Sequence, residues 1–340
     1  MSFDVVVKAG LVVSGERAVR ADIGIADGRI AAIEPELDAP AQETIEAEGL
    51  VVLPGPVDAH VHLNDPGRAS WRASRAGRER WPRGSTTAID MPLNSIPATV
   101  RADALAAKLR TASGRAYVDF ALWGGLVPGN VEHLPELAAL GVVGFKAFMP
   151  TTGIDDFIAC DDVTLLEGMM QAAELRLPVA VHAESDAITT VLTARARALG
   201  GRGVTEFLAS RPVIAEVEAV ARAVALAEAS GCSLHVVHVS SARALAEVLA
   251  GRARGVDVTC ETCPHYLVFD EESLEQLGAL AKCTPPCARP PTSTRCGRRS
   301  STDGFRWSPR ITRPRLCRSS GPTTSSTCGA ASRVASYCSR

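Results

Sequence analysis

The chain has 340 residues, of which 46% are hydrophobic and 22% charged, and its formal net charge is −2. This composition is typical of a soluble globular protein and gives no reason to expect a nucleic-acid or membrane partner. Because we find neither a signal-peptide pattern nor an apolar run of membrane-spanning length, we expect a cytoplasmic protein whose ten cysteines are reduced thiols.

Residues 1–50 are expected to form a small β-unit, a partial β-sandwich. Short β-prone runs recur there between polar residues and glycines, at residues 5–7, 11–13, 23–25 and 30–33.

From about residue 51 to residue 286 the pattern becomes strand, loop and helix, repeated. We predict strands at 50–53, 86–90, 117–122, 142–147, 178–182, 234–239 and 256–260, and helices at 102–110, 134–140, 163–174, 214–229 and 242–252. Parallel strands joined by helices make an α/β fold, here a (β/α)8 TIM-like barrel that is incomplete at strand 8. In such barrels the catalytic residues lie at the carboxyl ends of the strands.

Two histidines, His60 and His62, follow the first of these strands. Residues i and i+2 of a strand point to the same face, so both imidazoles are aimed at one point, which suits a metal ion such as Zn²⁺. The alternative is a pair of ordinary, half-buried strand histidines.

Two later strands also end in histidine, at His182 and at His238. His235 is three residues before His238, so we expect it to face the opposite side and to pack near the start of its strand. His133 is expected on the surface at a helix start.

Lys146 interrupts an otherwise apolar strand. A buried lysine is costly as a cation, so burial lowers the pKa of its amine. The neutral amine can then react with CO₂ to give a carbamate that is able to bridge two metals. The alternative is a lysine whose stem packs while its amine reaches water.

Several segments together resemble the cyclic amidohydrolases, over residues 3–286. They are 54–62 (Pro-Gly-Pro-Val-Asp-Ala-His-Val-His), 90–99 (Asp-Met-Pro-Leu-Asn-Ser-Ile-Pro-Ala-Thr), 144–149 (Gly-Phe-Lys-Ala-Phe-Met), 182–184 (His-Ala-Glu), 237–241 (Val-His-Val-Ser-Ser) and 261–267 (Glu-Thr-Cys-Pro-His-Tyr-Leu). Within this family, segments 91–95 and 121–126 resemble the allantoinase branch more than dihydroorotases or hydantoinases.

The resemblance implies a metal-dependent hydrolase barrel with two divalent ions, zinc being favoured. His60 and His62 would hold one ion, His182 and His238 the other, and carboxylated Lys146 would bridge them. A bridging hydroxide would then open the hydantoin ring of allantoin, a cyclic ureide, to give allantoate.

The resemblance also places Asn94 and the 282–286 loop, with Cys283, near the substrate, and the family tends toward homotetramers. A hydantoinase (dihydropyrimidinase) or a dihydroorotase remains open, as does a non-catalytic homologue or pseudogene product. Cys260 and Cys263 could alternatively form a redox or zinc pair.

The resemblance ends at residue 286. The family has a further ligand, an Asp in a Ser-Asp-His-Ser-Pro run at the end of strand 8, and this chain has no such run. Residues 287–340 instead hold eleven Arg, one Asp and five of the ten cysteines, a net charge of +10, so residues 1–286 carry −12. Their few large apolar residues cannot offset chain entropy, so we expect a disordered Arg/Ser/Cys-rich tail.

A shifted reading frame accounts for this tail. With permitted codons, residues 307–314 can encode Val-Ala-Ser-Asp-His-Ser-Pro, and residues 295–299 and 322–331 also resemble the family in that frame. We therefore infer a frameshift near Pro286 and Cys287, and a second, compensated one over residues 70–84, where the alternative is a divergent basic helix. Loss of the strand-8 Asp predicts weak or no hydrolysis by this chain.

Overall fold

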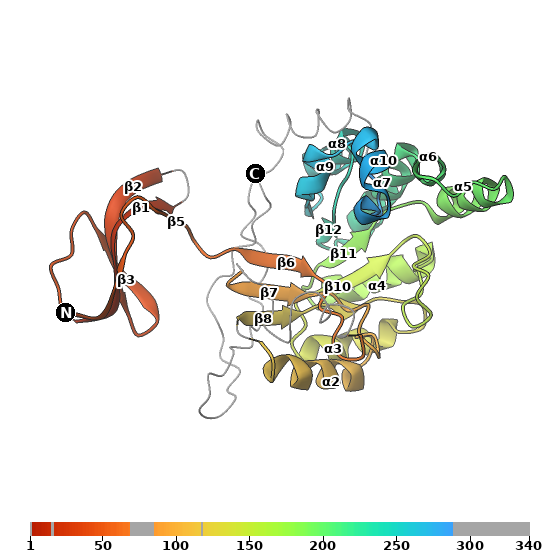
Figure 1. Cartoon of the computed structure of the whole chain (residues 1–340). Coiled ribbons are helices and arrows are strands. Elements are labelled where there is room, and N and C mark those ends of the chain that lie inside the picture. The colour runs from red at the N-terminus through yellow and green to blue at the C-terminus, as the bar shows by residue number, and fades with distance from the viewer. Residues whose placement is uncertain (1, 15–16, 69–84, 117, 288–340) are drawn as a thin grey trace. The chain divides into compact units, whose positions relative to one another are not determined.

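A computed structural model describes residues 2–14, 17–68, 85–116 and 118–287. The predicted aberrant tail, apart from Cys287, and the whole of the proposed shift over residues 70–84 lie outside these ranges. The chain separates into two compact units between Pro56 and Val57, six residues after the boundary expected at residue 50. Figure 1 labels helices and strands of both units.

The first unit is a five-stranded sheet of β1 (Phe3–Ser14), β2 (Arg17–Ala26), β3 (Arg29–Glu34), β4 (Ala41–Glu46) and β5 (Val51–Val52). Its order is β3-β2-β1-β4, and β5 also pairs with β1. Val12, Ala21 and Ile23 form its small core. Asp22 is also buried, and it accepts hydrogen bonds from Lys8 Nζ (2.8 Å) and from the backbone N–H of Ala9 (2.8 Å).

The prediction that residues 50–53 form the first barrel strand is wrong. β5 pairs in parallel with β1 of the first unit, with Val51 opposite Leu11. Pro54 and Pro56 follow, and neither has an N–H to continue a hydrogen-bonded ladder. The first strand of the second unit is therefore β6 (Val57–Val61), which contains His60.

The second unit is built from parallel strands that follow one another in chain order. One sheet has the order β6-β7-β8, with β7 (Thr87–Asp90) and β8 (Asp119–Leu122). The other runs from β9 (Gly124–Gly125) through β10 (Phe145–Phe148), β11 (Val179–His182) and β12 (Leu234–Val236) to β13 (Val258–Cys260). Only Trp123 separates β8 from β9, and its backbone N–H donates to the carbonyl oxygen of Asp90 at 3.0 Å.

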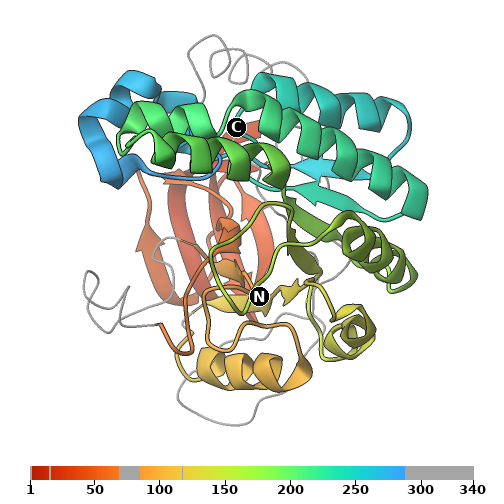
Figure 2. The same cartoon turned by 90° about the vertical axis from the view of Figure 1, so that its right-hand side faces the viewer.

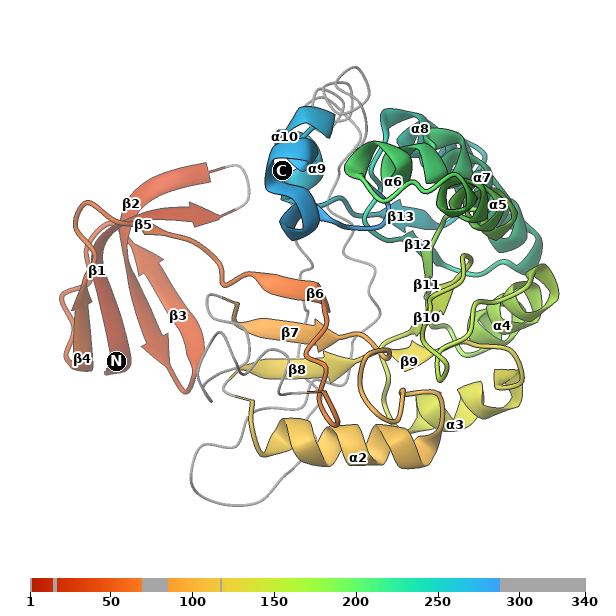
Figure 3. The ribbon, with the colours of Figure 1, turned by 45° about the vertical axis from the view of Figure 1, so that its right-hand side comes forward.

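Helices cover the outer side of these strands (Figures 2 and 3). The five predicted helices are confirmed as α2 (Ala102–Ser113), α3 (Leu134–Ala139), α4 (Asp162–Glu174), α7 (Val213–Ser230) and α8 (Ala242–Ala253). The prediction omitted α5 (Asp186–Ala198), α6 (Val204–Ser210), α9 (Pro264–Val268), α10 (Glu271–Leu277) and two 3₁₀ turns, Val131–His133 and Gly278–Ala281.

The hydrophobic core explains why the strand and helix assignments succeeded. β7 and β11 are buried along their whole length, as expected of parallel strands covered on both faces. Phe120, Phe145, Val179, Val220 and Leu245 belong to one core cluster that joins strands to helices. This α/β arrangement fits a TIM-like barrel, and β13 is the last strand in the described part of the chain. None of the helices described here has the length and apolar character needed to cross a membrane.

Candidate active site

Four histidines from three strands lie together at the carboxyl ends of the parallel strands. His60 is in β6 and His62 follows that strand, His182 ends β11, and His238 comes two residues after β12. The ring centroids of His60 and His62 are 5.3 Å apart, those of His182 and His238 4.5 Å, and those of His60 and His238 5.5 Å. The four candidate ligands therefore form two pairs that meet.

Lys146 lies in β10 and is completely buried. Its Nζ donates to the carbonyl of the next residue, Ala147, at 3.1 Å and lies 4.2 Å from the centre of the Phe148 ring. Burial lowers the pKa of the Lys146 amine well below its ordinary value, and the charge of Glu261 offsets this only in part. The alternative of an amine that reaches water is therefore wrong.

His182 is fixed by a carboxylate and an arginine. Its Nε2 lies 2.7 Å from Glu184 Oε2, which also accepts a hydrogen bond from Arg211 Nη1 at 2.5 Å. Phe148 stacks on the His182 ring at 4.7 Å. Burial lowers the pKa of His182 well below its usual value, and the positive charges of Lys146 and Arg211 lower it further. A neutral imidazole, the form that binds metals, is thereby favoured.

His238 has a strained backbone and an orphaned ring nitrogen. Its φ is +41°, a region that L-residues rarely adopt outside functional sites. Its Nδ1 is buried, with no hydrogen-bond partner in the part of the chain that the structure describes. Such a nitrogen is costly to bury unless something binds it, so it fits a metal ligand.

The loop after His238 is held by Glu216 from α7. The carboxylate accepts hydrogen bonds from Ser240 N (2.7 Å) and Ser241 Oγ (2.6 Å), and burial raises its pKa to about 7. Glu216, Glu184 and Arg211 also line a cavity of about 350 Å³ on the His182 side of the cluster.

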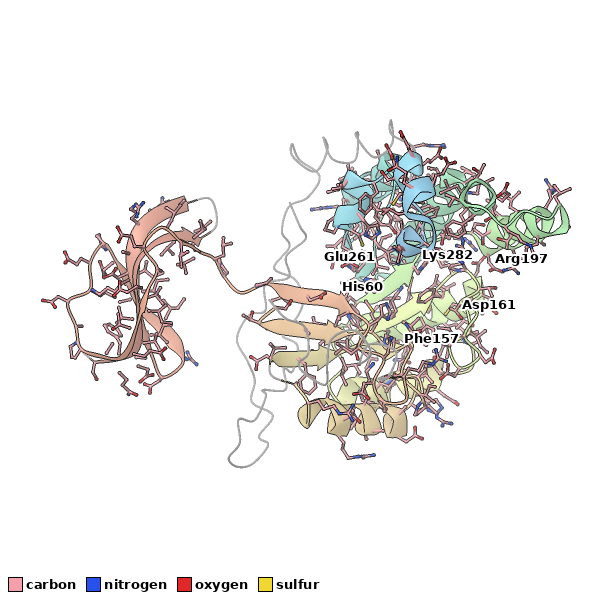
Figure 4. The ribbon with its side chains drawn as sticks, viewed as in Figure 1. His60, Phe157, Asp161, Arg197, Glu261 and Lys282 are labelled. Atoms are coloured by element: carbon pink, nitrogen blue, oxygen red, sulfur yellow. The ribbon has the colours of Figure 1, made fainter. Side chains whose placement is uncertain are left out.

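Glu261 joins His60 to a further histidine. It directly follows β13 and accepts a hydrogen bond from His60 Nδ1 (Figure 4). Its other oxygen lies 3.4 Å from His235 Nε2. Burial alone would raise the pKa of Glu261, but the hydrogen bonds from His235 and His60 outweigh it and hold the pKa well below its usual value.

The expectation that His235 points away from the site is wrong. β12 ends at Val236, and the positive φ of His238 breaks the alternation on which that expectation rested. His235 reaches the polar cluster through Glu261. His133 is partly exposed in a 3₁₀ turn, and its Nε2 lies 3.9 Å from Glu132 Oε1.

Comparisons with known proteins identify the family of the chain. Residues 49–244 match the family model described as dihydro-orotase-like. The chain belongs to the dihydro-orotase-like family. It is 53% identical over 286 residues to a protein named allantoinase from Rubrobacter xylanophilus (84% of this chain, 63% of the relative) and 46% identical to one from Deinococcus radiodurans (85% and 65%).

Solved structures also show a similarity to cyclic amidohydrolases. The L-hydantoinase (dihydropyrimidinase) of Arthrobacter aurescens superposes with a TM-score of 0.83 at 34% identity, over 89% of this chain and 68% of that one. The resemblance to cyclic amidohydrolases is thereby confirmed. The chain spans less than two thirds of the allantoinases it matches.

In this dihydro-orotase-like chain, the described residues hold no group of three or more His, Cys, Asp and Glu side chains placed to bind one ion. A metal centre with a modified lysine between the two histidine pairs nevertheless fits the residues present. The imidazoles are paired, His238 Nδ1 has no partner among the described residues, and the Lys146 amine is enclosed.

The two predicted substrate contacts lie in different places. Asn94 Nδ2 is 3.4 Å from His62 Nδ1, next to the histidine pairs, and its φ of +70° is one that Asn tolerates. Cys283 packs against a cluster of Tyr266, Leu274 and Cys287. Hydrogen bonds from Cys287 and His265 lower the pKa of Cys283 to about 5.

Sequence reasoning missed a buried ion pair behind the site. Lys108 of α2 lies 2.8 Å from Asp90 Oδ2 and donates to Met91 O at 2.6 Å. Asp90 Oδ1 accepts from the N–H of Leu63, the residue after His62. Asp90 could have been noticed in the sequence, because it is an Asp at the end of an apolar strand. Its partner Lys108 is in a helix whose sequence pattern gave no sign of a buried charge.

Cys260 and Cys263 are free thiols. Cys260 is in the hydrophobic core, and burial raises the pKa of Cys263 to about 12. Neither observation favours a redox or zinc pair.

Proposed function

We propose that this protein is an allantoinase by descent, which hydrolyses the hydantoin-ring amide of allantoin to give allantoate. The observation that carries the proposal is the pair of histidine pairs around the wholly buried Lys146. Relatives named allantoinase, 45–53% identical to this chain, support the choice of substrate over a hydantoin or dihydroorotate.

The proposed centre holds two divalent ions, most simply zinc. His60 and His62 would hold one, His182 and His238 the other, and a carbamate on Lys146 would lie between them. Two such ions would polarise the ring carbonyl and make a water nucleophile available near neutral pH. Imidazole and carbamate donors suit Zn²⁺, and they also suit Co²⁺ and Mn²⁺.

The chain's own residues would prepare this site. Burial keeps His182 and His238 neutral and therefore able to donate a lone pair. Burial likewise lowers the pKa of the Lys146 amine and so favours its neutral, nucleophilic form, which carbamate formation requires. We propose that Asn94, beside His62, orients the ureide, and that Cys283 lines the far side of the substrate site.

The remaining expectations are part of the same proposal. We expect a cytoplasmic homotetramer that acts on a small cyclic ureide, with no nucleic-acid or membrane partner. A non-catalytic homologue is the second candidate, because the strand-8 Asp of the family is absent from this sequence.

The test compares the chain as written with a version whose reading frame is restored over residues 70–84 and after residue 286. Formation of allantoate from allantoin is measured for both, with a hydantoin and dihydroorotate as competing substrates. We expect the restored protein to hydrolyse allantoin and the chain as written to do so weakly or not at all. If the restored protein produces no allantoate, the allantoinase proposal is wrong.

A further inference from the structure

Glu261 contacts histidines from two different strands. It accepts a hydrogen bond from His60 Nδ1 of β6, 201 residues earlier in the chain, and lies 3.4 Å from His235 Nε2 of β12. Its side chain is 17% exposed, so water has little access to compete for either oxygen.

The contact determines which nitrogen of His60 remains available. A neutral imidazole carries one proton, and a carboxylate can only accept it. His60 must therefore carry its proton on Nδ1, where it meets Glu261, and its lone pair is on Nε2. Proteins commonly orient a metal-binding histidine with a carboxylate that accepts a hydrogen bond from the ring nitrogen that does not bind the metal.

Glu261 is itself held in place by His235, which contacts the carboxylate oxygen that does not face His60. His235 Nδ1 lies 2.8 Å from Thr259 Oγ1, on the strand that leads to Glu261. Because a carboxylate can only accept, a neutral His235 carries its proton on Nε2, the nitrogen that faces Glu261 at 3.4 Å, and leaves Nδ1 facing the threonine hydroxyl. Both oxygens of the carboxylate are thus occupied, and Glu261 cannot rotate away from His60 without losing a second contact.

We propose that Glu261 is a positioning residue that fixes His60 as the Nδ1–H tautomer and presents Nε2 to the metal, and that His235 orients Glu261 and binds no metal. This inference rests on the proposed metal centre. It assigns a role to Glu261 and His235, neither of which is among the proposed metal ligands.

The test uses the full chain with ¹⁵N-labelled histidine, three variants for comparison and a fourth for assignment. Glu261→Leu removes both acceptors, Glu261→Gln keeps one, and Glu228→Leu removes a carboxylate from a half-exposed pair with Arg254 as the matched control. The tautomer of His60 is read from its ¹⁵N shifts without metal, assigned with His60→Gln. Co²⁺ affinity and stoichiometry are read from visible absorption, and folding from circular dichroism.

We expect wild type and Glu228→Leu to show the Nδ1–H tautomer and to bind two ions. Glu261→Leu should show mixed tautomers and lose about 10- to 100-fold in affinity for one of the two ions, with Glu261→Gln in between. An unchanged tautomer in Glu261→Leu, together with two ions bound at unchanged affinity, overturns the inference.

The outcomes for the proposed function are separate. Two ions bound without allantoin hydrolysis would count against the proposed activity and leave Glu261 its role. A wild-type chain that binds no Co²⁺ would count against the metal centre itself, and the His60 tautomer would still decide whether Glu261 positions that ring.

Discussion

At the scale of single residues, two fully buried lysines in this chain have opposite surroundings. Lys108 is paired with Asp90 at 2.8 Å, whereas Lys146 has a backbone carbonyl and an aromatic ring beside its amine. The pair satisfies a charge in the core, while the isolated amine has its pKa lowered by burial. Burial alone therefore does not decide what a lysine does.

This contrast predicts different effects of the same substitution. Lys108→Met leaves the buried carboxylate of Asp90 without its ammonium and should cost about 3–5 kcal/mol in unfolding free energy. Lys146→Met replaces an amine already disfavoured as a cation and should be neutral or mildly stabilising. Urea unfolding measures both. Equal destabilisation by the two substitutions would contradict the assignment of Lys146 as a neutral amine.

Lys146→Met should also abolish binding of the two ions, although the fold survives. Metal content per chain, measured by atomic emission after dialysis, checks this expectation, and the surface variant Glu228→Leu is the control. Retention of two ions by folded Lys146→Met would show that the lysine does not take part in the centre.

At the scale of elements, α7 controls the loop between β12 and α8. Glu216 accepts three hydrogen bonds from Ser240 and Ser241, and Ser241 also caps α8 by accepting from Ala244 N at 3.2 Å. One carboxylate on a helix thus sets the path of the loop that begins at His238. The nearby carboxylate of Glu184 adds to the electrostatic cost of ionising Glu216.

The pKa of about 7 at Glu216 predicts a pH effect on stability. Because the folded pKa is raised above the ordinary value of 4.5, the stabilising contribution is fully present below pH 4.5 and is lost as pH rises through 7. The full difference is at most about 3 kcal/mol. Glu216→Gln should flatten the fall in unfolding free energy between pH 4.5 and pH 7, the window set by these two pKa values. An unchanged slope would contradict the prediction.

At the scale of the whole molecule, the metal centre would draw its donors from strands β6, β10 and β11 and the turn after β12. A ligand that binds only the folded state stabilises it, by about 2.7 kcal/mol at one hundred times its dissociation constant. Adding Zn²⁺ or Co²⁺ should therefore raise the melting temperature of the second unit, and a chelator should reverse the shift. A melting curve that is insensitive to metal would contradict the proposed centre.

Much of this architecture could be predicted because it depends on local patterns. Apolar runs of four to six residues gave the parallel strands, and periodic apolar residues gave α2, α4, α7 and α8. The same reasoning failed at residues 50–53, since a short apolar run pairs equally well with either unit. It also failed at α5 and α6, which have few buried residues to mark a helical face.

The candidate ligands and the fold class could be inferred before folding was considered, because the histidine spacing, the lone strand lysine and the alternation of strands with helices are written in neighbouring residues. Three-dimensional packing was needed to show that Lys146 is wholly enclosed, that Lys108 pairs with Asp90, and that Glu261 holds His60 across 201 residues. The physical reason is that these contacts join side chains whose separation in the chain follows no period. Their partners become neighbours only when the strands assemble.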